Sequence, residues 1–271
     1  MEFEHLDYFA NQVIQRCNST NDLARKLGEA GYPHGTWVSS RVQNAGRGRL
    51  GRKWESLEGG LYLSLVVRMD AKPLWTWIPL ATAVGVAQSI LPLFGNNLSE
   101  IRIKWPNDVW ITSARGSSET WGKAGGILCE ALGSGSDSFV VVGIGLNCTT
   151  LPESLDLNAQ SLSIALHSPI FADEIRMPVL NSVLRSLDTL SHVGSLAIHE
   201  AYLPFAALPE GKMVQWLARS GSEIRTGKVK GLGELGELLV RETGSEEVVG
   251  LYAEDVRLVG MGSLGEKLPL R

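Results

Sequence analysis

The chain has 271 residues, with 25 Lys and Arg against 29 Asp and Glu, so its formal net charge at pH 7 is −4. Hydrophobic residues make up 44% of the sequence and charged residues 20%, which is ordinary for a globular protein and excludes disordered and collagen-like chains. Sequence-independent binding to nucleic acid depends on a general excess of Lys and Arg, which this acidic chain lacks. We therefore expect a folded protein that does not bind nucleic acid.

The cysteines and the amino terminus indicate the cytoplasm. Cys17, Cys129 and Cys148 are too few and too scattered for a disulfide framework, and neither they nor the five histidines have the spacing of metal ligands. The first seven residues are acidic where a signal peptide would be basic and then apolar. We expect a cytoplasmic protein with small buried thiols and with no metal held directly by its side chains.

Helix and strand patterns alternate through most of the chain. A helix is predicted just after residues 19–22, whose side chains can cap it, with Gly28 and Gly31 at its end. A second helix is predicted at 173–190, and strands are predicted at 36–42, 61–67, 101–105, 125–132 and 139–144. These elements predict an α+β fold, a mixed sheet with helices on one face.

The segment 75–94 is nearly long and apolar enough to span a membrane. It contains Pro79 at the start of the helical pattern, Pro92 near its end and the polar residues Thr82 and Gln88, and no basic cluster flanks it. We predict a helix buried against the sheet and no interaction with a membrane.

The pattern changes near residue 205. Beyond it, short apolar runs alternate with turn residues, at 213–217, 227–229, 237–240, 247–251 and 256–259. Several short strands at this close spacing predict a small antiparallel barrel. We expect a larger domain at 1–205 and a β-barrel domain at 206–271.

The most unusual segment is 41–54, which holds five cations and no acid in a protein that is acidic overall. The cations are Arg41, Arg47, Arg49, Arg52 and Lys53. Glycines between them let backbone N–H groups approach a ligand, and guanidinium groups match the oxygens of phosphate. Composition alone leaves open a phosphate site, a solvated basic loop, or a nucleic-acid patch with Trp54 as a stacking surface.

Three further segments place polar groups beside predicted strands. Lys104, Asn107 and Asp108 belong to the run Lys-Trp-Pro-Asn-Asp, in which proline favours a turn at the end of a strand. Lys123 begins a glycine-containing strand, and Asn147 ends another. Taken singly, each has an ordinary structural explanation as a turn residue or a surface lysine.

Taken in order, these segments resemble the landmarks of the biotin protein ligases. The matching residues are Ser19-Thr20-Asn21, Gln43, the run 46–54, the run 104–108, Lys123 with 126–128, and the run 143–147. The resemblance extends over about residues 15–260, and the arginine-glycine run and the Lys-Trp-Pro-Asn-Asp run are its most specific parts. It implies a mixed sheet flanked by helices, as in class II aminoacyl-tRNA synthetases, with an SH3-like barrel at the carboxyl end.

The sequence departs from the family pattern at three places, and no functional group is lost at any of them. Asn44 stands where the family often has Thr or Gln, Ala124 replaces a bulkier apolar residue, and 113–120 lengthens a hairpin.

The resemblance implies a two-step reaction. Biotin would be activated by ATP to biotinyl-5′-AMP, and the biotinyl group would pass to a lysine of the biotin carboxyl carrier protein of acetyl-CoA carboxylase. Because an anionic carboxylate must approach an anionic phosphate, clustered cations and Mg²⁺ are implied as well.

The resemblance also implies roles for individual residues. The ureido ring of biotin would be bound by Ser19, Thr20, Asn21 and Gln43, and biotin or its adenylate would also contact Arg47, Gly48, Arg49 and Lys123. ATP would be bound by Arg47, Arg49, Arg52, Trp54, Lys104, Asn107 and Asn147. The catalytic residues would be Lys123, Arg49 and Asp108, the last orienting the incoming lysine amine or helping to deprotonate it.

Rival functions are a lipoate-protein ligase, a biotin-responsive repressor and a non-catalytic biotin-binding module. The arginine-glycine run with Trp54 favours biotin over lipoate. Only eighteen residues precede Ser19, so we expect no DNA-reading domain. A module without catalysis would be expected to have lost Lys123 or Arg49, and the sequence retains both. A monomer and a homodimer both remain compatible with the sequence.

Overall fold

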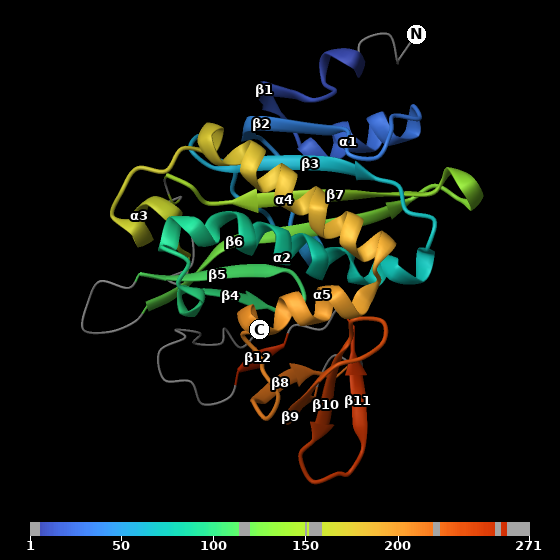
Figure 1. Cartoon of the computed structure of the whole chain (residues 1–271), viewed down its shortest axis with the longest axis vertical. Coiled ribbons are helices and arrows are strands. Elements are labelled where there is room, and N and C mark those ends of the chain that lie inside the picture. The colour runs from blue at the N-terminus through green and yellow to red at the C-terminus, as the bar shows by residue number, and fades with distance from the viewer. Residues whose placement is uncertain are drawn as a thin grey trace.

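The computed structural model describes residues 6–113, 120–149, 151, 159–218, 223–252 and 256–258. A seven-stranded sheet with helices packed against it forms the larger part of the protein, and a five-stranded antiparallel sheet forms the smaller part (Figure 1). The predicted α+β class is confirmed. Most of the lengthened hairpin at 113–120 and all of the segment 260–271 lie outside the described residues.

The large sheet has the strand order β1-β2-β3-β7-β6-β5-β4. The pair β1–β2 is parallel, and every other neighbouring pair is antiparallel. The strands are β1 (Gln12–Cys17), β2 (Trp37–Gln43), β3 (Leu61–Val67), β4 (Ile101–Lys104), β5 (Asp108–Ser113), β6 (Thr120–Leu132) and β7 (Phe139–Leu146). The sequence did not predict β1, an edge strand in which only Ile14 is buried, or β5, which begins inside the run read as a turn.

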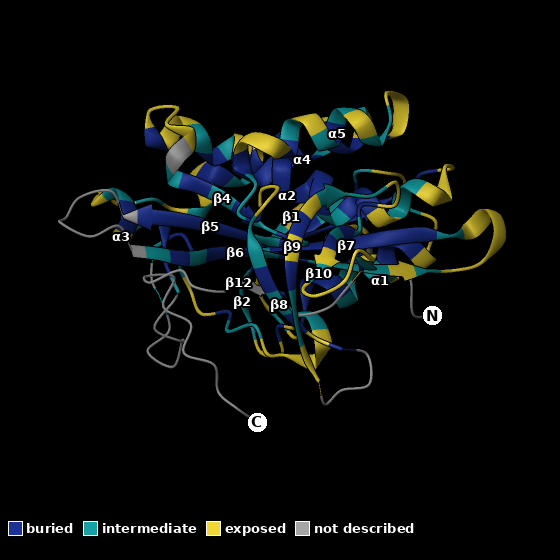
Figure 2. Cartoon of the chain, turned by 90° about the horizontal axis from the view of Figure 1, so that it is seen from below, coloured by how far each residue is buried: buried dark blue, intermediate teal, exposed yellow. Residues whose placement is uncertain are grey.

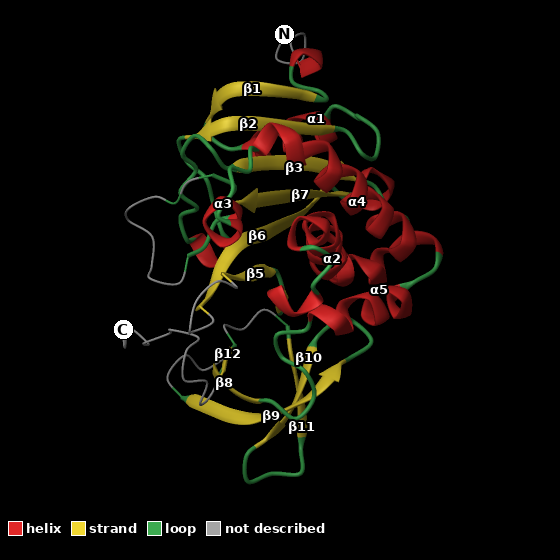
Figure 3. Ribbon diagram, turned by 60° about the vertical axis from the view of Figure 1, so that its left-hand side comes forward, coloured by secondary structure: helices red, strands yellow, loops and turns green. Residues whose placement is uncertain are grey.

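Helices lie on both faces of this sheet. One face is covered by α2 (Ile78–Ile90), α4 (Ala172–His192) and α5 (Ser195–Tyr202), as Figure 3 shows, and the short α3 (Leu162–Leu166) follows β7. Short 3-10 helices occur at Leu6–Tyr8, Arg49–Gly51, Lys72–Trp77, Leu91–Phe94, Leu98–Glu100, Gly135–Asp137 and Leu203–Phe205.

The expectation of helices on one face only was wrong, because α1 (Thr20–Glu29) packs on the opposite face. Its residues Ala24 and Leu27 join Val66, Phe139 and Val141 in a cluster separate from the core beneath α2 and α4. The helix ends as predicted, with Gly31 at φ +84° just beyond it, but Gly28 lies inside the helix. Gly28 is required there because a Cβ would overlap the ring of Phe139.

The side chains of β3 alternate between the two faces. Leu61, Leu63 and Leu65 belong to the core beneath α2 and α4, whereas Val66 belongs to the cluster beneath α1. All seven residues of the strand are buried, so the sheet is covered on both sides at this point. The neighbouring β7 is buried along most of its length as well, as Figure 2 shows.

The predicted core helix is confirmed. By length and composition the segment Lys72–Phe94 could cross a membrane, yet 67% of its apolar window is buried inside the protein. Pro79 lies in the first turn of α2, where a missing N–H costs nothing. The helix packs between the sheet and α4.

The small sheet has the order β11-β10-β9-β8-β12, with β8 (Met213–Leu217), β9 (Ile224–Leu232), β10 (Leu238–Glu242), β11 (Val248–Leu251) and β12 (Arg257–Leu258). Strands were predicted at each of these places. The turn between β9 and β10 is tied to the larger part of the protein by two buried tryptophans. Trp77 donates from Nε1 to the Glu234 carbonyl at 2.8 Å, and Trp105 donates from Nε1 to the Gly236 carbonyl at 2.9 Å.

We predict that Gly85→Ala destabilises the protein. A Cβ at Gly85 would lie 2.7 Å from the Cα of Val183 in α4. Overpacking of this kind costs about 1–3 kcal/mol, which exceeds the roughly 1 kcal/mol gained in helix propensity. Urea unfolding followed by circular dichroism measures the change, with Gln88→Ala on the exposed side of the same helix as the control. Unchanged or increased stability would contradict the prediction.

Candidate active site

A pocket opens on the face of the large sheet that carries α1. Strands β6 and β7 form its floor, the amino terminus of α1 forms one wall, and the turn between β4 and β5 forms the other. The segment 46–54, here called the arginine-glycine loop, runs along it. Thirteen of the predicted site residues line the pocket: Ser19, Thr20, Asn21, Gln43, Arg47, Gly48, Arg49, Arg52, Trp54, Lys104, Asn107, Asp108 and Lys123.

The floor is made of backbone where the pocket crosses it. Gly126, Gly143 and Gly145 line the pocket from β6 and β7. A Cβ at Gly143 would overlap the side-chain amide of Asn21, and a Cβ at Gly145 would lie 2.5 Å from the indole of Trp54. Glycine at these positions therefore lets Asn21 and Trp54 lie directly on the strands.

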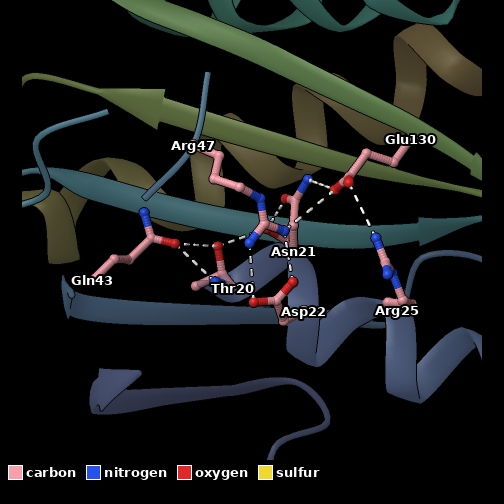
Figure 4. Close-up of polar contacts among 8 residues, drawn as sticks. Thr20, Asn21, Asp22, Arg25, Gln43, Arg47 and Glu130 are labelled. Atoms are coloured by element: carbon pink, nitrogen blue, oxygen red, sulfur yellow. Dashed lines mark hydrogen bonds and ion pairs between the residues drawn. The ribbon is translucent and has the colours of Figure 1, made fainter. Parts of the chain in front are cut away.

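Neutral polar groups fill one end of the pocket. The Thr20 N–H donates to Gln43 Oε1 at 2.8 Å (Figure 4). Gln43 Nε2 donates to Ser56 Oγ at 2.8 Å. Ser64 Oγ lies 2.7 Å from both Thr20 Oγ1 and Asn21 Oδ1. Since Ser19, Thr20, Asn21, Ser56 and Ser64 are all buried, this end offers fixed donors and acceptors in a site removed from water.

Sequence reasoning missed Ser64. It lies on β3 and is fully buried, and it connects two predicted site residues of α1. The signal was a serine inside a strand of otherwise aliphatic and aromatic residues, where a buried polar group must find partners. Ser19, predicted as a helix cap, does occupy the N-cap position of α1 but makes no side-chain capping hydrogen bond.

The arginine-glycine loop folds back on itself. The Trp54 N–H donates to the Gly46 carbonyl at 2.9 Å, and the Gly48 N–H donates to the Arg52 carbonyl at 2.7 Å. At its tip Leu50 has φ 57° and is 71% exposed. The loop is held on two sides of the pocket, since Arg47 contacts α1 and Arg49 Nη1 donates to Asn107 Oδ1 at 2.8 Å.

Arg47 belongs to a charged cluster beside the polar end of the pocket (Figure 4). Its Nη2 lies 2.6 Å from Asp22 Oδ1, its Nη1 lies 3.1 Å from Asp22 Oδ2, and Glu130 Oε2 is 4.0 Å from Nη2. Glu130 also accepts from Asn21 Nδ2 at 2.6 Å and from Arg25 Nη2 at 3.2 Å. The hydrogen bond with Arg47 lowers the pKa of Asp22 and raises that of Arg47. Sequence reasoning missed both acids.

At the other end of the pocket, Lys123 and Asp108 form an ion pair. Lys123 Nζ lies 2.8 Å from Asp108 Oδ1 and 5.4 Å from the centre of the Trp54 ring. The neighbouring Asn107 donates from Nδ2 to the Ile127 carbonyl at 2.7 Å, which fixes the turn against β6. The ammonium group is therefore held between a carboxylate and an aromatic face.

A β-bulge aims Lys123 into the pocket. Along β5, Asp108 and Trp110 oppose Gly126 and Lys123 of β6, so Ala124 is an extra residue in the register. Ala124 is fully buried in the core, and the bulge returns Lys123 to the same face as Gly126. In an unbroken strand Lys123 and Gly126 would point to opposite faces.

The remaining predicted residues divide into two groups. Arg52 and Lys104 line the pocket, and Lys104 Nζ lies 5.3 Å from the centre of the Trp110 ring. Asn147 is not among the lining residues, because it is buried beyond the end of β7. Its Nδ2 donates to the Gln160 carbonyl at 3.1 Å, and its N–H donates to the Ala124 carbonyl at 2.7 Å, so it supports the bulge beside Lys123.

The thiols and the acids give no sign of metal ligation or thiol chemistry in the described part of the chain. No group of three His, Cys, Asp or Glu side chains there could hold a metal ion. Burial raises the pKa values of Cys129 and Cys148 to about 12, so both thiols are protonated at neutral pH.

We predict that Gly145→Ala releases the arginine-glycine loop, because the added methyl group would displace Trp54 from the floor. Trypsin should then cut after the cations of this loop about threefold faster, as cleavage follows local opening. Trp54→Ala should have the same effect, and cleavage after the exposed Arg185 in the same digest is the internal control. Unchanged cleavage of the loop would show that Trp54 does not hold it.

Known proteins share much of this sequence and fold. The biotin/lipoate A/B protein ligase family matches residues 13–147. The biotin–[acetyl-CoA-carboxylase] ligase of Mycobacterium tuberculosis is 38% identical over 154 residues, which cover 55% of this chain and 53% of that protein. The match thus spans about half the length of that relative.

Two longer matches cover nearly the whole chain. The bifunctional ligase/repressor BirA of Bacillus spizizenii is 33% identical over 264 residues, covering 94% of this chain and 74% of that protein. A solved biotin protein ligase from Aquifex aeolicus in complex with biotin and ATP has a TM-score of 0.73 and 26% identity, covering 92% of this chain and 98% of that one. The chain belongs to the biotin protein ligases of the biotin/lipoate A/B protein ligase family.

Proposed function

We propose that this protein activates biotin with ATP to biotinyl-5′-AMP and transfers the biotinyl group to a lysine of the biotin carboxyl carrier protein of acetyl-CoA carboxylase. The observation that carries the proposal is one pocket that joins a buried neutral polar cluster to a set of cations and an acid–lysine pair. Two relatives support the substrates, one named a biotin–[acetyl-CoA-carboxylase] ligase and one solved with biotin and ATP.

The neutral end suits the ureido ring of biotin. The ring carries two N–H donors and one carbonyl acceptor, which need partners once they leave water. Ser19, Thr20 and Gln43 offer such partners. The amides of Asn21 and Gln43 are each bonded on both sides, to Ser64 and Glu130 and to Thr20 and Ser56, so the network orients both and leaves each a second N–H for the ring.

The same end argues against lipoate. A dithiolane ring has no N–H or carbonyl group, so the buried donors and acceptors around Thr20 and Gln43 would lose water without gaining partners. Leaving such groups unpaired is a strong basis for rejecting an analogue. The buried polar cluster thus favours biotin.

The cationic end suits adenylation. The carboxylate of biotin attacks the α-phosphorus of ATP and pyrophosphate leaves, so negative charge must be stabilised on both reactants. Arg49, Arg52, Lys104 and Lys123 supply positive charge around this end, and Lys123 is placed to meet the carboxylate. Trp54 offers a flat apolar face for a purine, and its buried Nε1 has no hydrogen-bond partner among the described residues.

Mg²⁺ fits this end as an ion carried on the phosphates. It prefers oxygen ligands and keeps several of its waters, binding through one or two carboxylates together with substrate phosphates. Asn107 and Asp108 are the oxygen-bearing side chains of the β4–β5 turn at the pocket. When bound, the ion would neutralise charge on the phosphates during adenylation.

The transfer step falls to Asp108. The amine of the acceptor lysine attacks the acyl carbonyl, AMP leaves, and the amine loses a proton. The Asp108 carboxylate, oriented by Lys123, can align that amine or receive its proton. We assign this chemistry to residues 1–205 and a barrel fold to 206–271, acting in the cytoplasm.

One assay tests the proposal. The full chain is incubated with ATP, Mg²⁺ and a biotin carboxyl carrier domain, with biotin or lipoate in parallel, and the modified lysine is identified by mass spectrometry. Biotinyl-lysine is expected. Modification by lipoate alone would favour the rival ligase, and no modification with either acid would favour a non-catalytic module.

We predict that Arg49→Gly lets the adenylate escape, because the guanidinium group of Arg49 is placed to hold its phosphate. Escaped biotinyl-AMP would label lysines of a bystander protein such as serum albumin, measured by blotting for biotin. A charged hydrogen bond contributes about 1.5–3 kcal/mol, so retention should fall about tenfold or more. Arg225→Ala, in the small sheet, is the control, and unchanged selectivity in Arg49→Gly would refute this role.

We predict that Asp108→Asn slows transfer more than adenylation. The substitution keeps the shape of the side chain but removes the charge that pairs with Lys123. Transfer from preformed biotinyl-AMP should slow by about a hundredfold if Asp108 acts on the amine. The rate is followed on the carrier domain, and Asp188→Asn on the exposed side of α4 is the control. Transfer at the wild-type rate would mean that Asp108 has no part in this step.

A further inference from the structure

The arginine-glycine loop is fixed at one end by an ion pair that no motif of the sequence predicts. We infer that Asp22 is a positioning residue that holds Arg47 against α1, and that Arg47 anchors the loop instead of binding phosphate. This inference departs from the ATP-binding role implied for Arg47 by resemblance. It rests on the proposed function for its kinetic test and on the geometry alone for its structural test.

The first argument is the geometry of the pair. Each terminal nitrogen of Arg47 reaches one carboxylate oxygen of Asp22, at 2.6 Å and 3.1 Å, in the two-pronged arrangement that guanidinium and carboxylate groups prefer. Figure 4 shows the Arg47 side chain directed toward Asp22 at the start of α1. The two terminal N–H groups of Arg47 that would bind a phosphate are therefore already hydrogen-bonded to Asp22.

The second argument is charge. Arg47 lies between two acids, since Glu130 Oε2 is 4.0 Å from the same Nη2 that bonds Asp22. Glu130 also pairs with Arg25, so two arginines face two carboxylates and the cluster is neutral as a whole. A phosphate brought to Arg47 would approach both carboxylates, and that repulsion would oppose its binding.

The third argument is what the anchor holds. The backbone of Arg47 forms a β-bridge with that of Lys53 across the loop. Its neighbours Gly46 and Gly48 make the two backbone hydrogen bonds that close the loop on itself. Asp22 lies two residues after Thr20, whose N–H holds Gln43 at the neutral end of the pocket. The ion pair therefore fixes the loop relative to the groups proposed to meet the ureido ring of biotin. Loss of the ion pair should therefore weaken the binding of biotin more than the binding of ATP.

The kinetic test compares Asp22→Asn, Arg47→Gln and the double variant in biotin-dependent exchange of pyrophosphate into ATP. Each single substitution should raise the KM for biotin about fivefold and change the KM for ATP by less than about twofold, as expected for a partly exposed but two-pronged ion pair. The double variant should resemble each single one, because both remove the same interaction. Exchanging the charges, with Asp22→Arg and Arg47→Asp together, should recover part of the affinity for biotin.

The matched control is Asp173→Asn. Asp173 pairs with Arg41 and Arg176 at a similar exposure but lies outside the pocket, so this variant should keep both KM values. Thermal melts of all variants separate loss of folding from loss of positioning. A rise in the KM for ATP in Arg47→Gln that is absent from Asp22→Asn would overturn the inference, since Arg47 would then act on phosphate. An unchanged KM for biotin in Asp22→Asn would overturn it as well.

A structural test needs no activity. Trypsin should cut the arginine-glycine loop about threefold faster in Asp22→Asn than in the wild type, since the loop would open more often without its anchor. Equal cleavage would count against the anchor. If the wild type catalyses no biotin-dependent exchange, the proposed function fails, and the digestion still decides whether Asp22 holds the loop.

Discussion

The site depends on a stretch of the sheet that packs apolar side chains on the α2–α4 face and has only glycines where the opposite face forms the pocket floor. Val142 and Ile144 of β7 belong to the core beneath α2 and α4, while Gly143 and Gly145 of the same strand form the pocket floor. The apolar face supplies the burial that stabilises the sheet. The glycines of the floor let Asn21 and Trp54 approach the backbone. A single methyl group on the floor would displace one of them, so stability and binding are separated on opposite sides of one strand.

The two ends of the pocket differ in charge, which is balanced at the α1 end and positive toward the β4–β5 turn. At the α1 end the acids Asp22 and Glu130 balance Arg47 and Arg25, which leaves neutral donors and acceptors to face the ligand. Toward the β4–β5 turn, cations line the pocket. A molecule with a neutral polar head and an anionic tail would be oriented by this gradient before any specific contact forms.

Much of the site was predictable because its residues lie in short runs with unusual composition. The strand at β3 was predicted at its observed bounds, and the polar residues beside β4 and α1 were recognised in their runs. Sequence could not predict the interactions that depend on register or on distant pairing. The bulge that turns Lys123 follows from one extra residue opposite β5, and the contact of Asn21 with Glu130 joins residues 109 positions apart. The side of the sheet chosen by α1 also depends on packing partners far along the chain.

The turn between β9 and β10 joins the segment beyond residue 205, where the composition changes, to the larger part of the protein. Its carbonyl groups accept the indole N–H groups of Trp77 and Trp105, both buried in the larger part of the protein. A chain truncated there would leave two donors unpaired, at a cost of about 1–3 kcal/mol each. Trp105 is followed within three residues by Asp108, so truncation would also loosen the segment that carries the proposed transfer residue. The small sheet therefore helps to hold the turn that carries Asp108, although the pocket itself is built mainly on the large sheet.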